Sequence, residues 1–431
     1  MEKSCKLYDN KDNTINITLG RYCELNELEE IKELKPGLDF RKPEYRREVF
    51  FNFYEFHLKY KSHPGGVYYL FPYLAKKYNF DTEQKLWFAY INGCTQNPLT
   101  TWVLFNQFPD FKNITFDKLE KWHRKYWKYL DYDIDRRYQK GHFVEMAMNY
   151  KEIVGDKTQE EFFMELCNTD NVFKNFDNVW DKIINKFFMY GRLSTFSYTE
   201  YLKIMGLPIE CSNLFIFDKS GSKSHRNGLC IVNGRDDLDW RKDNEFIQKE
   251  LKGHNKDIMK WIEFEGEQLL NEAKERFKGR DFYEDVNYFT LESTLCCYKS
   301  WHRKNRRYPG VYNDMMYDRI KKAESIGWDK ILGNNINFND FWDARKEYLP
   351  KYMRMEDNPD DPGLDKVKQN WYRNTGQVII MDNEFDHFKN DFNTKENFNR
   401  DKIIEKSLEW YGKPPKRYSS KKEGNLNKSI F

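Results

Sequence analysis

The sequence predicts a mainly α-helical protein with a small β-hairpin insertion. Apolar residues recur at helical spacing over most of residues 41–330, and two short strand-like runs, LFIFD (214–218) and LCIVNG (229–234), flank a polar segment. The chain has 431 residues, including 34 Phe, 29 Tyr and 12 Trp, so it is long enough for more than one core. We expect aromatic side chains to fill most of these cores.

Four regions are expected along the chain. Residues 1–40 form a polar leader, and residues 41–210 form a helical domain. Residues 211–330 combine the β-hairpin insertion with a second helical segment that contains a basic helix-turn-helix-like block. Residues 331–431 are irregular and end in a basic tail.

Individual helices are predicted from apolar spacing and from breaker residues. HPGGVYYLFPYL (63–74) is expected to interrupt the helical pattern because it contains Pro-Gly-Gly. In residues 187–208, Ser197 marks the expected helix start, with Glu200 in the capping-box position. Further helices are predicted at 46–61, 83–95, 97–108 and 243–275, with a long amphipathic stretch at 116–150 and a helix, basic turn and helix at 289–324.

Composition excludes several classes of protein. Lys and Arg number 72 and Asp and Glu 69, a net charge of +3, so any binding of nucleic acid must come from local basic patches. No apolar run is long enough for a membrane-spanning helix. The eight cysteines are scattered with no CxxC pair, so we expect reduced thiols and a cytoplasmic location, in the host cytoplasm if the protein is viral. Phosphate-loop, HExxH, GxSxG and dinucleotide motifs are missing, and we expect no metal and no cofactor.

A first candidate site lies at the end of the helix predicted at 46–61. Glu55, His57, Lys61 and His63 fall just before a Gly-Gly turn. Residues four apart share a helix face, so His57 and Lys61 lie together, while His63 lies at the helix terminus. Such a helix end can present a base or a cation to an anionic substrate. A plain charged helix face is the alternative.

A second candidate site is the turn NGCTQNP (92–98) between two apolar helices. Its amide residues Asn92, Gln96 and Asn97 are of the types that read base edges or hold a base extruded from the duplex. Helix capping is the alternative, because Asn97-Pro98 is an ordinary helix start.

The segment FDKSGSKSHRNG (217–228) is expected to form the tip of the β-hairpin. Its Lys, Arg, His and Ser side chains suit a phosphate or pyrophosphate, because they supply positive charge and hydrogen-bond donors while glycines allow a tight backbone. A solvated loop is the alternative. The candidate substrate-binding residues are Asp218, Lys219, Ser222, Lys223, Ser224, His225, Arg226 and Asn227.

Residues 298–312, YKSWHRKNRRYPGVY, form a basic block with interleaved aromatic side chains. Its cations can meet nucleic-acid phosphates while its rings stack on bases, and a solvated basic turn is the alternative. The candidate DNA-binding residues are Lys299, Trp301, Arg303, Lys304, Arg306, Arg307 and Tyr308.

Several longer blocks contain these segments: RREVFFNFYEFHLKYKSHPGGVYY, LWFAYINGCTQNPLTTWVLFNQFP, FMYGRLSTFSYTEYLKIMGL, FDKSGSKSHRNGL, LESTLCCYKSW and RRYPGVYNDM. Together they resemble the amino acid:DNA transferases, a bacteriophage family of DNA base-hypermodification proteins earlier named the alpha-glutamyl/putrescinyl thymine pyrophosphorylases. The similarity spans about residues 40–320.

The resemblance implies a substrate and a fold. Family members act on double-stranded DNA that carries 5-hydroxymethyluracil, a modified thymine that an upstream DNA base kinase has pyrophosphorylated. The amino group of an amino acid or polyamine displaces the pyrophosphate. The family is related to the helix-hairpin-helix DNA glycosylases, which implies a helical, DNA-glycosylase-like core and base flipping.

Roles within these blocks are assigned from the chemistry that this reaction requires. The cations of 217–228 are expected to hold the departing pyrophosphate, and the amides of 92–98 to read the extruded base. The amine must lose a proton, and the base is expected among Glu55, His57 and His63. The carboxylate and ammonium of the incoming amino acid are expected to contact Arg192, Tyr198 and Glu200.

Two other functions fit the sequence. A helical DNA glycosylase or lyase would excise a modified base, with Lys59 or Lys61 as its amine, and would leave abasic sites and borohydride-trapped complexes. A non-catalytic DNA-binding accessory of a modification complex would bind without turnover.

Overall fold

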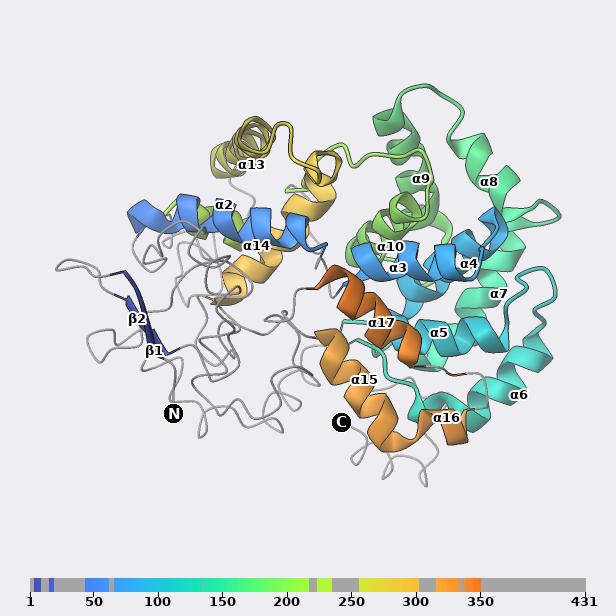
Figure 1. The fold of residues 1–431 in the computed structure, drawn as a ribbon. Helices are drawn as coiled ribbons and strands as arrows, with labels where there is room; N and C mark the ends of the chain where they lie inside the picture. The colour runs from blue at the N-terminus through green and yellow to red at the C-terminus, as the bar shows by residue number, and fades with distance from the viewer. Residues whose placement is uncertain are drawn as a thin grey trace, which may run out of the picture. The chain divides into compact units, whose positions relative to one another are not determined.

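The computed structural model describes residues 4–8, 15–18, 43–61, 66–133, 135–216, 223–234, 256–301, 315–332, 336 and 338–349. Within these residues the protein is helical except for one pair of short strands, which confirms the mainly α-helical prediction (Figure 1). The chain divides into two compact units. Unit 1 takes its residues from 1–69, 213–317 and 343–398, and unit 2 from 70–212, 318–342 and 399–431.

Unit 1 is built around a buried helix. Its elements are β1 (Ser4–Tyr8), β2 (Ile15–Thr18), α2 (Pro43–Lys59), α11 (Lys223–Val232), α13 (Lys256–Arg276), η4 (Tyr283–Asp285) and α14 (Tyr288–Trp301). The strands are antiparallel, with Ser4 opposite Thr18. Helix α11 packs against α2, α13 and α14. Aromatic side chains of α2, among them Phe50 and Tyr54, fill the core with Tyr298 and Phe277 from the second half of the unit.

One glycine allows α11 to lie directly against α14. A Cβ atom added to Gly228 would stand 2.1 Å from the backbone oxygen of Leu295, closer than any real contact permits. Only a residue without a side chain fits there. The close approach of these two backbones positions the polar residues just before Gly228 next to the side chains of α14.

Unit 2 contains α3 (Val67–Lys77, from residue 70), α4 (Thr82–Thr95), α5 (Pro98–Gln107), α6 (Phe116–Tyr126), η1 (Trp127–Tyr129), η2 (Lys140–His142), α7 (Phe143–Val154), α8 (Gln159–Leu166), α9 (Val172–Lys186), α10 (Arg192–Ile204) and α16 (Trp328–Ile331). Helices α15 (Met315–Ile326) and α17 (Asn339–Tyr348) contribute residues to both units. Helix α4 contacts α5, α8 and α10. Rings of α4, α7 and α10 form its aromatic core, in which Tyr90 stacks on Tyr150 at 4.0 Å and meets Tyr198 edge-on at 5.6 Å.

The prediction of a β-hairpin insertion is wrong. The run LCIVNG begins inside α11, which covers Lys223–Val232, and residues 214–216 are irregular. The β-branched residues Ile231 and Val232 favour a strand locally, but both are buried in the helical core of unit 1. Tertiary packing therefore decided the conformation against local propensity.

Two helix boundaries also differ from prediction. Residues 63–74 were predicted to interrupt the helical pattern, but α3 begins at Val67, directly after Pro-Gly-Gly, and includes the exposed Pro72. Helix α10 begins at Arg192 after the N-cap Gly191, so Ser197 is not a helix start. Its hydroxyl donates to the backbone oxygen of Leu193 inside the helix, and no capping box forms there.

The other helical predictions agree with the structure. Helices α2, α4 and α5 cover the segments expected, and Pro98 occupies the first turn of α5. The amphipathic stretch 116–150 is divided into α6, two short 3-10 turns and α7. Helices α14 and α15 flank the predicted basic turn, whose residues 302–314 lie outside the described residues, as do most of 1–40, residues 243–255 and 350–431. Among the described helices, none is both long and apolar enough to cross a membrane.

Candidate active site

The first turns of α11 carry the predicted phosphate-binding residues as a helix start and not as a loop. Lys223 begins α11, Ser224 is half-buried, and His225, Arg226 and Asn227 are buried. Asp218, Lys219 and Ser222 lie outside the described residues. Together with Glu292 and Lys299 of α14, the residues Ser224, His225, Arg226 and Asn227 make up what we name the α11 site.

His225 is held between two oxygen acceptors. Its Nε2 lies 2.8 Å from the backbone oxygen of Leu214, and its Nδ1 lies 3.1 Å from Oε1 of Glu292. The ring and the carboxylate form an ion pair when His225 is protonated on both nitrogens. The His225 and Glu292 side chains are 0% and 8% exposed, so the two groups meet inside the core of unit 1.

Two cations complete the α11 site. The Lys299 ammonium donates to the hydroxyl of Ser224 and lies 3.8 Å from Sγ of Cys296, and Lys299 is only 4% exposed. The guanidinium of Arg226 donates to the backbone oxygen of Ile216 at 3.4 Å, and burial lowers its pKa. Arg226 and Lys299 therefore bring two buried cations to the α11 site.

Lys299 was predicted to contact DNA, and its side chain lies in the α11 site. Trp301 ends α14, and Arg303, Lys304, Arg306, Arg307 and Tyr308 lie outside the described residues. The DNA-contacting role of this block stays a prediction.

The predicted catalytic residues of α2 diverge in the structure. Glu55 forms an ion pair with Arg280 at 2.6 Å, whereas His57 is buried and meets the ring of Phe53 edge-on at 4.1 Å. Burial lowers the pKa of His57 to about 3, so the ring is neutral near pH 7. Lys61 is exposed just after the helix, with a φ of 49°, and His63 lies outside the described residues.

Unit 2 holds a second group of buried polar side chains, where α4 ends and α5 begins. Asn92 is fully buried, and its Oδ1 accepts from the hydroxyl of Thr101 at 2.9 Å, while its Nδ2 has no hydrogen-bond partner in the described part of the chain. Gln96 ends α4 with a φ of 48°, and its Oε1 likewise has none. These two amides are the polar groups of this turn that the fold leaves available.

Asn97 has the capping role that its position before Pro98 suggests. Its Oδ1 accepts from the backbone nitrogens of Leu99 at 3.1 Å and Thr100 at 3.3 Å. Its Nδ2 donates to Asp131 at 3.4 Å. Because its amide is occupied by these contacts, Asn97 stabilises the start of α5.

The predicted donor-binding residues all lie on α10 and are buried. Arg192 follows the N-cap and lies over the ring of Phe196, with its Cζ 4.9 Å from the centroid. Tyr198 belongs to the aromatic core, where burial raises its pKa well above the usual value. Glu200 is 1% exposed and acts electrostatically on the neighbouring Tyr201.

Sequence reasoning missed the arginine that joins the end of α4 to α10. Arg136 is fully buried, and its guanidinium donates to the backbone oxygens of Gly93 at 3.1 Å and Leu193 at 3.2 Å and to Ser197 at 3.2 Å. Gln139, three residues later, donates to Ser194 at 3.1 Å. We give the name α4–α10 network to Arg136, Gln139, Ser194 and Ser197 together with Asn92, which precedes the Gly93 that Arg136 contacts.

Charged groups border the α4–α10 network. Asp133 forms an ion pair with Arg319 at 2.6 Å, and burial raises the pKa of Asp133 against the opposing effect of that arginine. Lys140 is buried, which lowers its pKa to about 8, and its Nζ lies 5.4 Å from the Trp127 ring centroid. The amphipathic pattern of 116–150 offered no signal for these residues, since their partners are distant in sequence.

The sequence of the chain matches the amino acid:DNA transferase family over residues 69–307, more than half of its length. The chain belongs to this family. The transferase is also 27% identical over 304 residues to a protein named serinyltransferase from Salmonella phage ViI, an alignment that covers 68% of this chain and 71% of the phage protein. No solved structure matches the chain.

The matched region of this transferase contains the α11 site and the α4–α10 network, and it begins after α2. Glu55, His57, Lys61 and His63 therefore lie outside the match. Glu292, which sequence reasoning also missed, lies within it. The single charged residue in the helical segment FTLESTL was the available signal, since a buried acid needs a partner.

The described residues of the transferase include no group of three or more His, Cys, Asp or Glu side chains placed to hold a metal ion. What they provide is a buried cationic site in unit 1 and a buried network of amides, hydroxyls and arginine in unit 2.

Proposed function

We propose that this transferase attaches an amino acid or a polyamine to pyrophosphorylated 5-hydroxymethyluracil in double-stranded DNA and releases pyrophosphate. The observation that carries the proposal is the family match over residues 69–307, which contains the α11 site and the α4–α10 network. The resemblance of the sequence blocks supports the same substrate. An upstream DNA base kinase would supply the pyrophosphorylated base.

The reaction sets three requirements for the protein. The amine nitrogen bonds to the methylene carbon on the base while the bond from that carbon to the pyrophosphate oxygen breaks and its electron pair leaves with the oxygen. The amine gives up a proton to a base, and the departing group gains negative charge, which preorganised cations stabilise. Besides this proton acceptor, the protein thus needs a site for the anion, a site that recognises the nucleobase and a pocket for the amine donor.

The α11 site meets the first requirement. The cations Arg226 and Lys299 outnumber the single carboxylate of Glu292, so the site has an excess of positive charge. These residues also lie at or beside the start of α11, where backbone amides point outwards and the helix dipole favours anions. Pyrophosphate bound here would offset the repulsion among the cations.

The predicted bases differ in their fitness for the proton transfer. Glu55 is held by Arg280, and the pKa of His57, about 3, lies far below the range in which a general base works best at neutral pH. Lys61 remains exposed beside α2, and His63 keeps the role of base as a prediction.

The α4–α10 network and its neighbours suit recognition of the base and the donor. The edge of a uracil ring presents both acceptors and a donor, which match the Nδ2 of Asn92 and the Oε1 of Gln96. Arg192 and Glu200 would contact the donor's carboxylate and ammonium. Serine is the first donor to test, since the related phage protein is named a serinyltransferase.

Access to the methylene group requires the base to leave the duplex, since a stacked base cannot enter a buried pocket. We therefore include base flipping in the proposal, with a helical core similar to that of the helix-hairpin-helix DNA glycosylases. The mainly helical units are compatible with this relation.

The experiment supplies the protein with duplex DNA that contains pyrophosphorylated 5-hydroxymethyluracil and, separately, serine, glycine, lysine, glutamate and putrescine. The DNA is digested to nucleosides for mass spectrometry. We expect an amine adduct on the thymine methyl carbon with one donor and stoichiometric pyrophosphate. Unphosphorylated 5-hydroxymethyluracil DNA is the matched control and should give no adduct.

Other products would identify the alternatives. Pyrophosphate release without an adduct would contradict the transfer reaction, and abasic sites with borohydride-trapped complexes would indicate a glycosylase or lyase. DNA binding without any product would indicate an accessory protein.

A further inference from the structure

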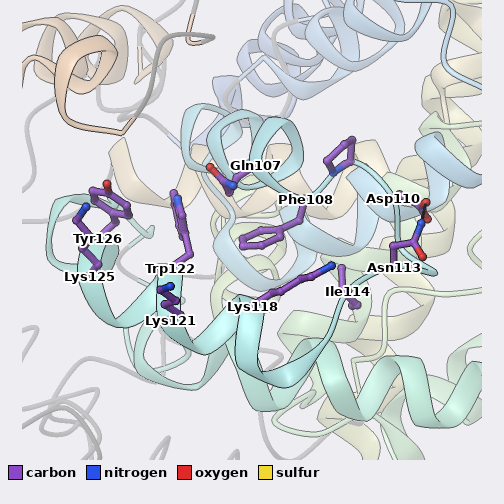
Figure 2. A pocket seen from close by; sticks show the side chains of 11 residues that line it. Gln107, Phe108, Asp110, Asn113, Ile114, Lys118, Lys121, Trp122, Lys125 and Tyr126 are labelled. Carbon is purple, nitrogen blue, oxygen red and sulfur yellow. Dashed lines mark hydrogen bonds between the residues drawn. The ribbon is translucent and has the colours of Figure 1, made fainter.

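A groove lies in unit 2 between α6 and the segment that follows α5 (Figure 2). Its volume is about 520 Å³, and α6 provides one wall while Phe108 and Ile114 contribute to the other. This surface belongs to neither the α11 site nor the α4–α10 network, and it is separate in sequence from the basic block 298–312.

Three lysines of α6 line the groove on one helix face. Lys118, Lys121 and Lys125 are spaced three and four residues apart, so they follow one another along the same side of the helix, and all three are exposed. Among the described residues, no carboxylate forms an ion pair with any of them. Arg124, on another face, is held by Glu120 at 3.2 Å and contrasts with these lysines.

Aromatic rings form the apolar part of the groove. Trp122 is half-buried between two other rings, with its centroid 5.7 Å from Phe108 and 5.1 Å from Tyr126 (Figure 2). The ammonium of Lys125 lies 4.7 Å from the Tyr126 centroid. Lysines beside half-exposed aromatic rings are the combination that contacts phosphates and stacks on sugars or bases.

Asp110, the one acidic residue that lines the groove, accepts hydrogen bonds from its own loop. Asp110 accepts from the backbone nitrogen of Lys112 at 2.9 Å and from the amide of Asn113. Asp110 therefore stabilises the loop after α5. Because three lysines line the groove with this one carboxylate, the groove has an excess of positive charge.

We propose that this groove binds one strand of the DNA substrate, with Lys118, Lys121 and Lys125 at phosphates of that strand and with Trp122 and Tyr126 against the adjoining sugars or an unstacked base. At 1.5 Å per residue, Lys118 and Lys125 are about 10.5 Å apart along α6. Phosphates of one strand advance about 3.4 Å per nucleotide along the duplex axis, so the three lysines would span about three nucleotide steps if α6 lay along that axis. The choice of DNA as occupant rests on the proposed function.

The test compares two variants with the same change in charge. K118Q/K121Q/K125Q removes the groove lysines, and K76Q/K174Q/K186Q removes three exposed lysines of α3 and α9. The affinity of each full-length protein for a fluorescent duplex is measured between about 50 and 300 mM salt. Over such a range the logarithm of the binding constant falls roughly linearly with the logarithm of the salt concentration, because binding releases counterions from the DNA. Folding is checked by thermal denaturation.

We expect the groove variant to bind about 10- to 100-fold more weakly near 100 mM salt, with its salt dependence reduced by about 2.7 in log-log slope. The loss should be similar for all DNA sequences, because phosphates carry no sequence information. The control should bind as the wild type does. Equal affinity and slope in the groove variant and the wild type would overturn the proposal, as would equal losses in both variants.

The measurement separates this inference from the proposed function. If no DNA yields an adduct but the groove variant alone loses affinity, the groove binds DNA and the proposed reaction fails. If adducts form and the groove variant keeps both its affinity and its KM for DNA, the reaction stands and the groove does not bind DNA. When both are correct, the groove variant raises KM for DNA and leaves kcat near that of the wild type.

Discussion

The α11 site of unit 1 and the α4–α10 network of unit 2 are both buried and polar, yet they differ in charge. The α11 site contains the cations Arg226 and Lys299 and the pair of His225 with Glu292, whereas the α4–α10 network is made of amides and hydroxyls with one arginine that donates to backbone oxygens. An excess of charge suits an anionic leaving group, and a neutral network suits recognition by hydrogen bonds. The two units therefore bury polar groups of different charge, and each group can be tested separately.

The largest expected effect comes from breaking the ion pair of the α11 site. Glu292→Gln leaves His225 buried without a carboxylate and should lower the free energy of unfolding by about 3–5 kcal/mol. Adding His225→Gln should restore part of the loss. Denaturant titration at pH 7 measures both, with the exposed Glu263→Gln of α13 as control. Strictly additive losses would show that the pair is not coupled.

The cationic character of the α11 site can be tested through turnover. Arg226→Gln should lower kcat by about 10²–10³-fold, the effect of removing one preorganised donor from a developing anion, and combining it with Lys223→Gln should abolish turnover. Arg276→Gln, which alters a half-exposed arginine of α13, should leave kcat near the wild-type value. Adduct formation at saturating DNA and donor is the measurement. Full activity in the double variant would remove the α11 site from the reaction.

The packing that forms the α11 site predicts a smaller loss of stability. Gly228→Ala forces a Cβ against the backbone oxygen of Leu295 and should destabilise the protein by about 3 kcal/mol, a strong case of overpacking. Gly191→Ala in unit 2, where nothing lies within 4 Å, should cost under about 1 kcal/mol as an N-cap change. The melting temperatures compare the two. Similar values would mean that α11 does not approach α14 this closely.

Acid should affect unit 1 through His57. Its pKa is about 3 in the folded protein and 6.5 as the ordinary value, so only the unfolded chain takes up this proton between those pH values. Stability from this group is thus lost on acidification at about 1.4 kcal/mol per pH unit. His57→Gln should remove this dependence of the free energy of unfolding on pH. Denaturant titrations between about pH 5 and 7 measure it, since this range overlaps the interval between the two pKa values. An unchanged slope would contradict the burial of His57.

Alkali should affect unit 2 in the opposite direction through Lys140. Its pKa is about 8 when folded and 10.5 ordinarily, so between these values the unfolded chain holds a proton that the folded protein lacks, and stability rises with pH. The rise is at most about 1.4 kcal/mol per pH unit. Lys140→Met should therefore exceed the wild type in stability at pH 7, with an advantage that shrinks above pH 8. A stability difference that does not change with pH would contradict the burial of the Lys140 ammonium.

Sequence patterns located most helices because apolar periodicity reports which face is buried. They failed at α11, where β-branched residues and a glycine suggested a hairpin, and at α3, where the breakers proved to act only before Val67. Both failures are local: propensity sums over neighbours in sequence, while the contact of Gly228 with Leu295 joins segments that are far apart.

The candidate site was predicted in part. The residue types of 223–227 pointed to an anion, and the structure adds Glu292 and Lys299 as their neighbours on α14. Asn97 has the capping role that was the alternative interpretation, whereas Asn92 keeps an amide group without a partner in the described residues. Arg136 was missed because its acceptors, Gly93 and Leu193, are backbone oxygens that no side-chain motif reveals.

Composition and apolar period were enough to predict that the chain is mainly helical, that its cores are aromatic, and which residue types are available for chemistry. The tertiary structure decided which side chains meet. The ion pair of His225 with Glu292, the lowered pKa of Lys140 and the row of exposed lysines along the α6 groove all depend on burial and on contacts between distant segments. Burial changes the energy of a charge by several kcal/mol, an effect that position along the chain does not encode.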